Sequence, residues 1–148
     1  MSNKKPTYKD VWTTLREVDT SSIQYKKQSL DYIGWADAWA TLMDNYPQAV
    51  YVFEEPTFYG EEGKKTCEVT CSVYIGDLQR TMSLPVMTSS LPMKSILNPT
   101  SRDIGDAQQR CLVKAIAMFG LGLHLWEKKK SSLGGVSNDE FVNDEAEF

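Results

Sequence analysis

The sequence predicts an α+β fold, in which three strands form an antiparallel meander, with an N-terminal helix before the sheet and a long C-terminal helix after it. Two patterns support this fold class. From Thr66 to Ile75, apolar and polar side chains alternate with the two-residue period of a strand that has one buried face. From Ile104 to Leu123, apolar side chains recur every three or four residues, which is the period of a helix packed on one side.

The length and composition of the chain favour one domain. It has 148 residues, 41% of them hydrophobic, which is enough for a single core. We expect a core domain at 1–130 and a flexible acidic tail at 131–148, because the latter segment is rich first in Gly and Ser and then in acidic residues. Neither a membrane helix nor a signal peptide is evident, so a soluble, cytoplasmic protein is expected.

Two helices are expected in the first third of the chain. Tyr8, Val11, Trp12 and Leu15 have helical spacing, and the polar segment IQYKKQS that follows is interpreted as an exposed connector. A second helix is predicted from Leu30 to Tyr46, closed by a proline. Its apolar positions are Trp35, Ala38, Trp39, Leu42, Met43 and Tyr46.

The sheet is predicted from three strands that follow one another along the chain. Residues 49–59 and 65–75 form two of them, joined by a GEEGKK turn, and residues 78–86 form the third after a Gly-Asp turn. Cys67 and Cys71 fall on the apolar face of the second strand, so they are interpreted, with Cys111, as core residues. His124 is the one histidine, and no zinc site is expected.

A loop at 88–101 precedes the C-terminal helix. It contains two prolines and no periodicity, and loops of this length in a compact domain are often functional. Thr100 or Ser101 can cap the helix, and Gly120 and Gly122 are expected to end it. The buried side is predicted to comprise Ile104, Ala107, Cys111, Leu112, Ala115, Met118, Phe119 and Leu123.

The charge of the chain is unevenly distributed. The formal net charge is −4, yet residues 1–130 hold all 16 basic residues and only 15 of the 20 acidic ones, which leaves them at +1. A body of this charge can bind phosphate if its cations share one face, because the local field matters more than the total. Composition therefore permits nucleic-acid binding without requiring it.

Two segments indicate a protein family, and they do so more specifically than the periodic patterns described above. They are LDYIGWADAWATLMDNYP at 30–47 and DIGDAQQRCLVKAIAMFGLGLHLW at 103–126. Over roughly residues 7–127, the chain resembles the Sak-type single-strand annealing proteins of bacteriophages, which share a superfamily with the eukaryotic Rad fifty-two annealing protein. The resemblance implies an α+β core in which a three- to four-stranded antiparallel sheet packs on the long C-terminal helix. It also implies protomers that assemble into rings or helical oligomers, with single-stranded DNA in a basic groove around the outside. It also implies that Lys114 lies in that groove.

Annealing requires that the phosphates be neutralised while the bases stay free to pair, which Lys and Arg can do without reading sequence. The candidate DNA-binding residues lie on the C-terminal helix, at its approach and at the hairpin tip: Lys114, Arg110, Arg102, Lys94, Lys64 and Lys65. Trp35 and Trp39 are interpreted as core residues because of their helical spacing. Tyr59 and Tyr74 are better candidates for base stacking if they lie on an exposed sheet face.

The implied function is ATP-independent annealing of complementary strands in phage recombination, inside the host cell and without a cofactor. The alternative is a passive single-stranded DNA-binding protein that recruits partners through its acidic tail. Such a partner would be a phage or host replication or recombination protein. An enzyme is not expected, because the sequence contains neither a P-loop nor paired carboxylates near a histidine.

Overall fold

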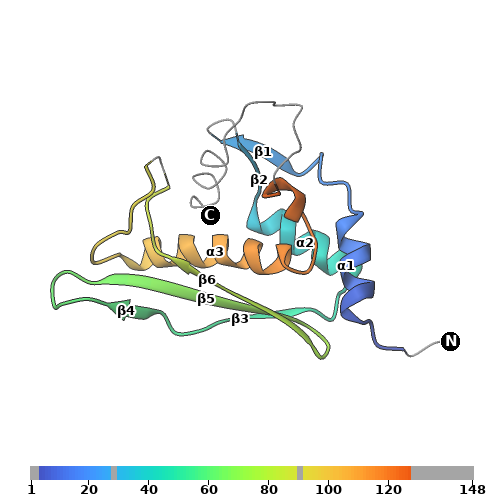
Figure 1. The fold of residues 1–148 in the computed structure, drawn as a ribbon, viewed down its shortest axis with the longest axis horizontal. Helices are drawn as coiled ribbons and strands as arrows, with labels where there is room; N and C mark the ends of the chain where they lie inside the picture. Colours follow the sequence, from blue (N-terminus) through green and yellow to red (C-terminus); the bar gives the residue numbers. More distant parts are fainter. Residues whose placement is uncertain (1–3, 28–29, 90–91, 128–148) are drawn as a thin grey trace.

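The computed structural model describes residues 4–27, 30–89 and 92–127. It has an α+β architecture in which helix α3 lies along one face of an antiparallel sheet, with a small hairpin on the far side of the helix from the sheet (Figure 1). In chain order the elements are α1 Tyr8–Arg16, β1 Gln24–Lys27, β2 Leu30–Ile33, α2 Trp35–Asn45, β3 Val50–Phe53, β4 Thr57–Tyr59, β5 Thr66–Ile75, β6 Leu78–Pro85, α3 Ser101–Ala117 and the short 3₁₀ helix η1 Leu123–Leu125.

The main sheet is the predicted antiparallel meander, with β5 in the centre. β6 pairs with β5 along one edge, while β3 and β4 share the other. The single strand expected at 49–59 is therefore two shorter strands. Glu54 still donates its backbone N–H to the carbonyl of Thr70 at 3.0 Å. Pro56 has no N–H to donate, so the ladder is interrupted between β3 and β4.

The predicted alternation of apolar and polar residues along β5 is confirmed, and it gives the strand one buried apolar face and one polar face. The apolar residues, from Cys67 to Ile75, are at most 2% exposed and face α3, and Cys111 on α3 is fully buried against them. The opposite face carries hydroxyl side chains that pair across the strands: Thr70 with Ser83 at 2.8 Å, and Ser72 with Thr81 at 2.7 Å. The three cysteines are free core thiols, as predicted.

Helix α3 is shorter than the sequence predicts. Its start is as expected: Thr100 accepts a hydrogen bond from the backbone of Asp103 at 3.2 Å, and the Asp103 carboxylate accepts from the backbone of Thr100 at 2.9 Å. It ends at Ala117, after 17 residues, and not near Leu123. Met118, predicted to be buried, is 40% exposed.

The glycines that follow α3 explain the early end. Gly120 and Gly122 have φ angles of 124° and 72°, which side-chain-bearing residues rarely adopt. At Gly122 a Cβ atom would also lie 2.6 Å from Cδ1 of Ile33, so a larger residue there would have to displace this side chain of β2. This contact brings the segment after α3 against the hairpin.

The N-terminal part departs most from the prediction. The segment expected to be a connector forms β1, and residues 30–33, expected to be helical, form its partner β2. Helix α2 begins only at Trp35. Cross-strand pairs explain the preference for strands: Tyr25 stacks on Tyr32 with ring centroids 5.8 Å apart, and Lys26 pairs with Asp31 at 3.5 Å.

The N-terminal helix is confirmed, and it connects the two ends of the described core. Val11 and Leu15 are fully buried, and Arg16 forms an ion pair with Glu127 near the end of the described chain. Arg80 of β6 lies over the ring of Tyr8 at 4.2 Å. No helix in the described part of the chain is long and apolar enough to cross a membrane.

Candidate nucleic-acid interface

A groove of about 340 Å³ lies between α3, the β1–β2 hairpin and the beginning of α2, and we call it the α3 groove. Three separate segments of the chain form its walls, and residues of the loop after β6 and of the segment after η1 complete them. Its described lining residues are Tyr25, Lys27, Tyr32, Ile33, Gly34, Trp35, Ser89, Met93, Asp106, Gln109, Arg110, Val113, Lys114 and Trp126.

The basic side chains of the groove come from two opposing walls. Arg110 and Lys114 lie one turn apart on α3, and both are half-buried. Lys27 comes from the end of β1 and is exposed. Tyr25 and Lys27 are two residues apart on one strand, so they point to the same face of the hairpin. The fold thus brings together two predicted cations and one that was not predicted.

Arg110 is held in a way that suits anion binding. One terminal nitrogen, Nη2, donates to the backbone carbonyl of Met87 at 3.3 Å, which fixes the side chain. Its Nε is buried and has no hydrogen-bond partner among the described residues. Burial lowers the pKa of Arg110, and the nearby Asp106 carboxylate opposes this shift. The group still keeps its charge at neutral pH, so an anion in the groove would satisfy a buried donor.

Aromatic side chains form the wall opposite α3. Tyr25, stacked on Tyr32, is 50% exposed, and Trp35 at the start of α2 is 42% exposed. The expectation that Trp35 is a core residue is therefore wrong. Trp39 does pack, edge to face, against Tyr51 of β3 with ring centroids 5.0 Å apart. On α2, the narrow buried stripe of Ala38 and Leu42 leaves Trp35 outside the core.

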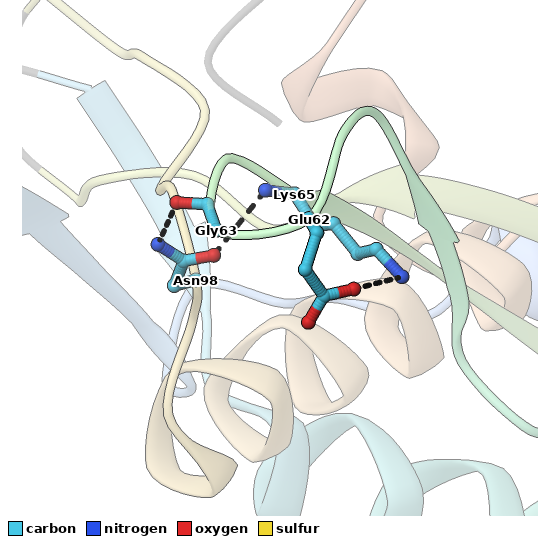
Figure 2. A network of polar contacts seen from close by, with 4 residues as sticks. All are labelled: Glu62, Gly63, Lys65 and Asn98. Carbon is cyan, nitrogen blue, oxygen red and sulfur yellow. Dashed lines mark hydrogen bonds and ion pairs between the residues drawn. The ribbon is translucent and has the colours of Figure 1, made fainter.

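Three of the other predicted cations lie near the opposite end of α3, around the turn between β4 and β5. Asn98 connects this turn to the approach to α3: its side-chain amide donates to the carbonyl of Gly63 at 2.8 Å and accepts from the backbone N–H of Lys65 at 3.2 Å (Figure 2). Arg102 follows four residues later, in the first turn of α3. Lys64, Lys65 and Arg102, all near this connection, are called the turn cluster below.

The members of the turn cluster differ in how they are held. Lys64 and Arg102 are exposed, whereas Lys65 is half-buried and forms an ion pair with Glu62 at 3.8 Å (Figure 2). Arg102 precedes Asp106 by one turn, so it extends the α3 row that lines the groove. Since α3 rises about 1.5 Å per residue, Arg102 and Lys114 are separated by about 18 Å along the helix.

Lys94 lies on the loop between β6 and α3, at the margin of the α3 groove. This loop closes on itself: the backbone N–H of Thr88 donates to the carbonyl of Lys94 at 2.8 Å, the backbone N–H of Lys94 donates to the Thr88 hydroxyl at 3.1 Å, and Met87 bridges to Ser95. The neighbouring Met93 lines the groove, but Lys94 itself is exposed outside it. In the part of the chain that the structure describes, no group of three or more His, Cys, Asp or Glu side chains is placed to hold a metal ion.

Comparison with known protein families identifies the family of the chain. The family model of the Sak Single Strand Annealing Protein matches residues 9–130, which is most of the chain. The chain belongs to the Sak family. Membership confirms the resemblance found in the sequence and implies that the protein binds and anneals single-stranded DNA in phage recombination. No curated protein matches the chain significantly.

In this Sak family member, the hairpin half of the groove was not predicted from the sequence. Tyr25, Lys27 and Tyr32 were assigned to a connector and to a helix. The segment YKK has no alternation of apolar and polar residues, and the alternation in LDYI is too short to outweigh the helical spacing of the residues that follow. Tyr59 and Tyr74, the preferred stacking candidates, lie on the face of the sheet away from α3, where Tyr59 is 53% exposed.

Proposed function

We propose that the protein holds single-stranded DNA in the α3 groove, without sequence preference, and anneals complementary strands without ATP. The observation that supports this most directly is the buried, unsatisfied Nε of Arg110 beside Lys114 in a groove that faces Lys27. Three cations and exposed aromatic rings in one groove of a single-strand annealing family member fit a phosphodiester backbone. The sequence contains no P-loop, which is consistent with a reaction that needs no nucleotide.

Cations on both walls would contact the phosphates, and the aromatic rings on one wall would contact the bases. Arg110 can offer a hydrogen-bond donor as well as a charge, and Lys114 and Lys27 supply charges on either side of the strand. The rings of Tyr25 and Trp35 offer flat surfaces to any base, because every base has a π-face. Neither kind of contact reads sequence, as a protein that anneals arbitrary strands requires.

The turn cluster and Lys94 would continue the path of the strand along the molecule. Arg102 extends the α3 row beyond Asp106, and Asn98 holds the Lys64–Lys65 turn close to the start of the same helix. A strand that leaves the α3 groove in this direction would meet exposed cations. Each phosphate contact in such a path adds to affinity and makes it more dependent on salt.

Self-association would align the grooves of neighbouring protomers into a ring or filament. β3 supports this part of the proposal, because it is an edge strand whose side chains are exposed on both faces: Val50, Tyr51 and Val52 are 54%, 40% and 48% exposed. Exposed apolar edge strands favour pairing with another chain. An array would neutralise a long strand at regular intervals, which a single protomer cannot do.

The alternative function is passive protection of single-stranded DNA, with recruitment of a partner through the acidic tail. Residues 131–148 lie outside the described part of the chain, so this proposal is supported by sequence alone. The last ten residues contain five acids and end in Phe148. The tail could also compete with DNA for the α3 groove, in which case truncation after Lys130 would tighten DNA binding.

The deciding experiment compares the parent protein with Lys114→Glu in annealing of two complementary labelled oligonucleotides, in EDTA and without ATP. Lys9→Glu on α1 makes the same charge change outside the groove and is the matched control. Circular dichroism and light scattering check that folding and oligomer size are unchanged.

We expect the parent and Lys9→Glu to accelerate annealing and Lys114→Glu to lose most of this acceleration. Lys114→Gln should also reduce the salt slope of single-strand binding by about 0.7, the value for one lost phosphate contact. Tight binding by the parent without acceleration would favour the passive protein. Full activity of both Lys114 variants would place the DNA on another surface.

A further inference from the structure

One acidic side chain stands among the cations of the α3 groove. Asp106 is exposed, lines the groove, and lies one turn before Arg110 on α3, which in turn lies one turn before Lys114. The three residues therefore form one row along the helix, with spacing of four. Asp106 is the single carboxylate among the described lining residues of the groove.

The contacts of Asp106 do not explain its presence. Its side chain forms no hydrogen bond or ion pair with any described residue, and the acidic position that caps α3 is occupied by Asp103. Its charge nevertheless reaches the groove, because it raises the pKa of Arg110 against the effect of burial. The carboxylate is thus placed where it acts on whatever anion Arg110 would hold.

The physical effect of such a placement is repulsion of bound phosphate. A DNA strand in the α3 groove would meet the three cations Lys27, Arg110 and Lys114, and Asp106 would cancel part of their attraction. An annealing protein gains from this, because it must release a duplex after pairing, and a groove of maximal affinity would retain its product.

We propose that Asp106 is a counter-charge that limits the affinity of the α3 groove for phosphate and so sets how fast a bound strand leaves. This inference rests on the proposed function, since it assigns a regulatory role within the same groove. The chemistry it requires is only electrostatic, and no bond is formed or broken. Asp106 would act on dissociation, because it lines the groove beside Arg110 and therefore repels a phosphate that is already bound there.

The test is the dissociation rate of a labelled oligothymidine from the full-length protein, measured by stopped-flow competition at low and high salt. Asp106→Asn removes the charge at nearly constant shape, Asp106→Glu keeps the charge, and Asp44→Asn makes the same charge change at the end of α2, outside the groove. For Asp106→Asn we expect dissociation about two- to tenfold slower at low salt, with the difference shrinking as salt screens the charge. Dissociation from the other two variants should match the parent.

The same variants distinguish this inference from the function on which it rests. When protein is limiting, Asp106→Asn should slow repeated rounds of annealing although it binds more tightly. If the parent binds DNA and Asp106→Asn dissociates at the parent rate, the counter-charge is refuted while the groove assignment stands. Faster dissociation of Asp106→Asn would mean that the carboxylate contacts DNA favourably, through base amino groups. A parent that binds no single-stranded DNA would refute both.

Discussion

At the scale of single residues, Arg110 shows which features of the groove follow from the sequence and which follow only from the structure. Its position one turn from Lys114 on a helix was evident from spacing alone, and so was a shared external surface. In the structure, the loop after β6 fixes the guanidinium through the carbonyl of Met87, and the Nε stays buried and unsatisfied. Both features depend on contacts between segments that are distant in sequence. Such tertiary contacts leave no periodic signal.

Asn98 is a second residue whose role emerges only from the structure. Among the described residues other than glycine, it alone has a positive φ, 51°, and its side chain holds the turn between β4 and β5 (Figure 2). Asparagine tolerates this conformation better than most residues. The connection fixes the start of α3 relative to the sheet, and with it the location of the turn cluster.

We predict that Asn98→Gly lowers the free energy of unfolding by about 1–3 kcal/mol, because two hydrogen bonds to the turn are lost while the backbone conformation stays accessible. Asn98→Ala should cost about 1 kcal/mol more, since alanine also strains at positive φ. Urea unfolding followed by circular dichroism measures both. Equal stability of the two variants would show that the backbone conformation at this position costs nothing.

At the scale of elements, the long periodic segments were predictable and the short ones were not. β5 and α3 were identified because ten and seventeen residues give clear periods of 2 and 3.6. The β1–β2 hairpin has four residues in each strand, and its pairing is stabilised by cross-strand contacts that no single strand reveals. The break between β3 and β4 has the same origin, because Pro56 matters only once β5 lies opposite.

The hairpin and the start of α2 carry the next prediction, which concerns the aromatic wall. Trp35→Ala should weaken single-strand binding by about 1–3 kcal/mol, the usual value for a stacked base. The salt slope should stay that of the parent, because no phosphate contact is lost. Fluorescence anisotropy at three salt concentrations measures both quantities.

The control for this variant is Trp12→Ala. Trp12 is 40% exposed on α1 outside the groove, and packs against Arg16 with the guanidinium 5.1 Å from its ring. Its loss should leave DNA affinity unchanged. If Trp35→Ala instead lowered the salt slope as Lys114→Gln does, the ring would be positioning a cation and not contacting a base.

At the scale of the whole molecule, the two faces of the sheet have different chemistry. The α3 side carries the groove and its cations, whereas the outer face of β5 and β6 carries mainly hydroxyl, amide and acidic groups, and no Lys or Arg lies on that face. The residues of that outer face are Thr66, Glu68, Thr70, Ser72, Tyr74, Gln79, Thr81, Ser83 and Pro85. This contrast predicts that DNA covers one side of each protomer.

The native cysteines make this difference between the faces measurable. Burial raises the pKa of Cys71 to about 12 and that of Cys111 to about 11, and it also raises the pKa of Cys67. Because the thiolate is the reactive form, all three native thiols should resist a maleimide near pH 7.5. A cysteine introduced at the surface would then be labelled selectively without removing the native ones.

We predict that bound single-stranded DNA slows labelling of Gln109→Cys, in the α3 groove, and leaves labelling of Ser83→Cys, on the outer sheet face, at its DNA-free rate. Both positions are exposed, so the two variants should react alike without DNA. Mass spectrometry of timed reactions gives the rates. Protection of both would indicate a strand wrapped around the protomer or a contact between protomers across the outer face. Protection of Ser83→Cys alone would move the DNA to the hydroxyl face and leave the cations of the groove without a role in binding.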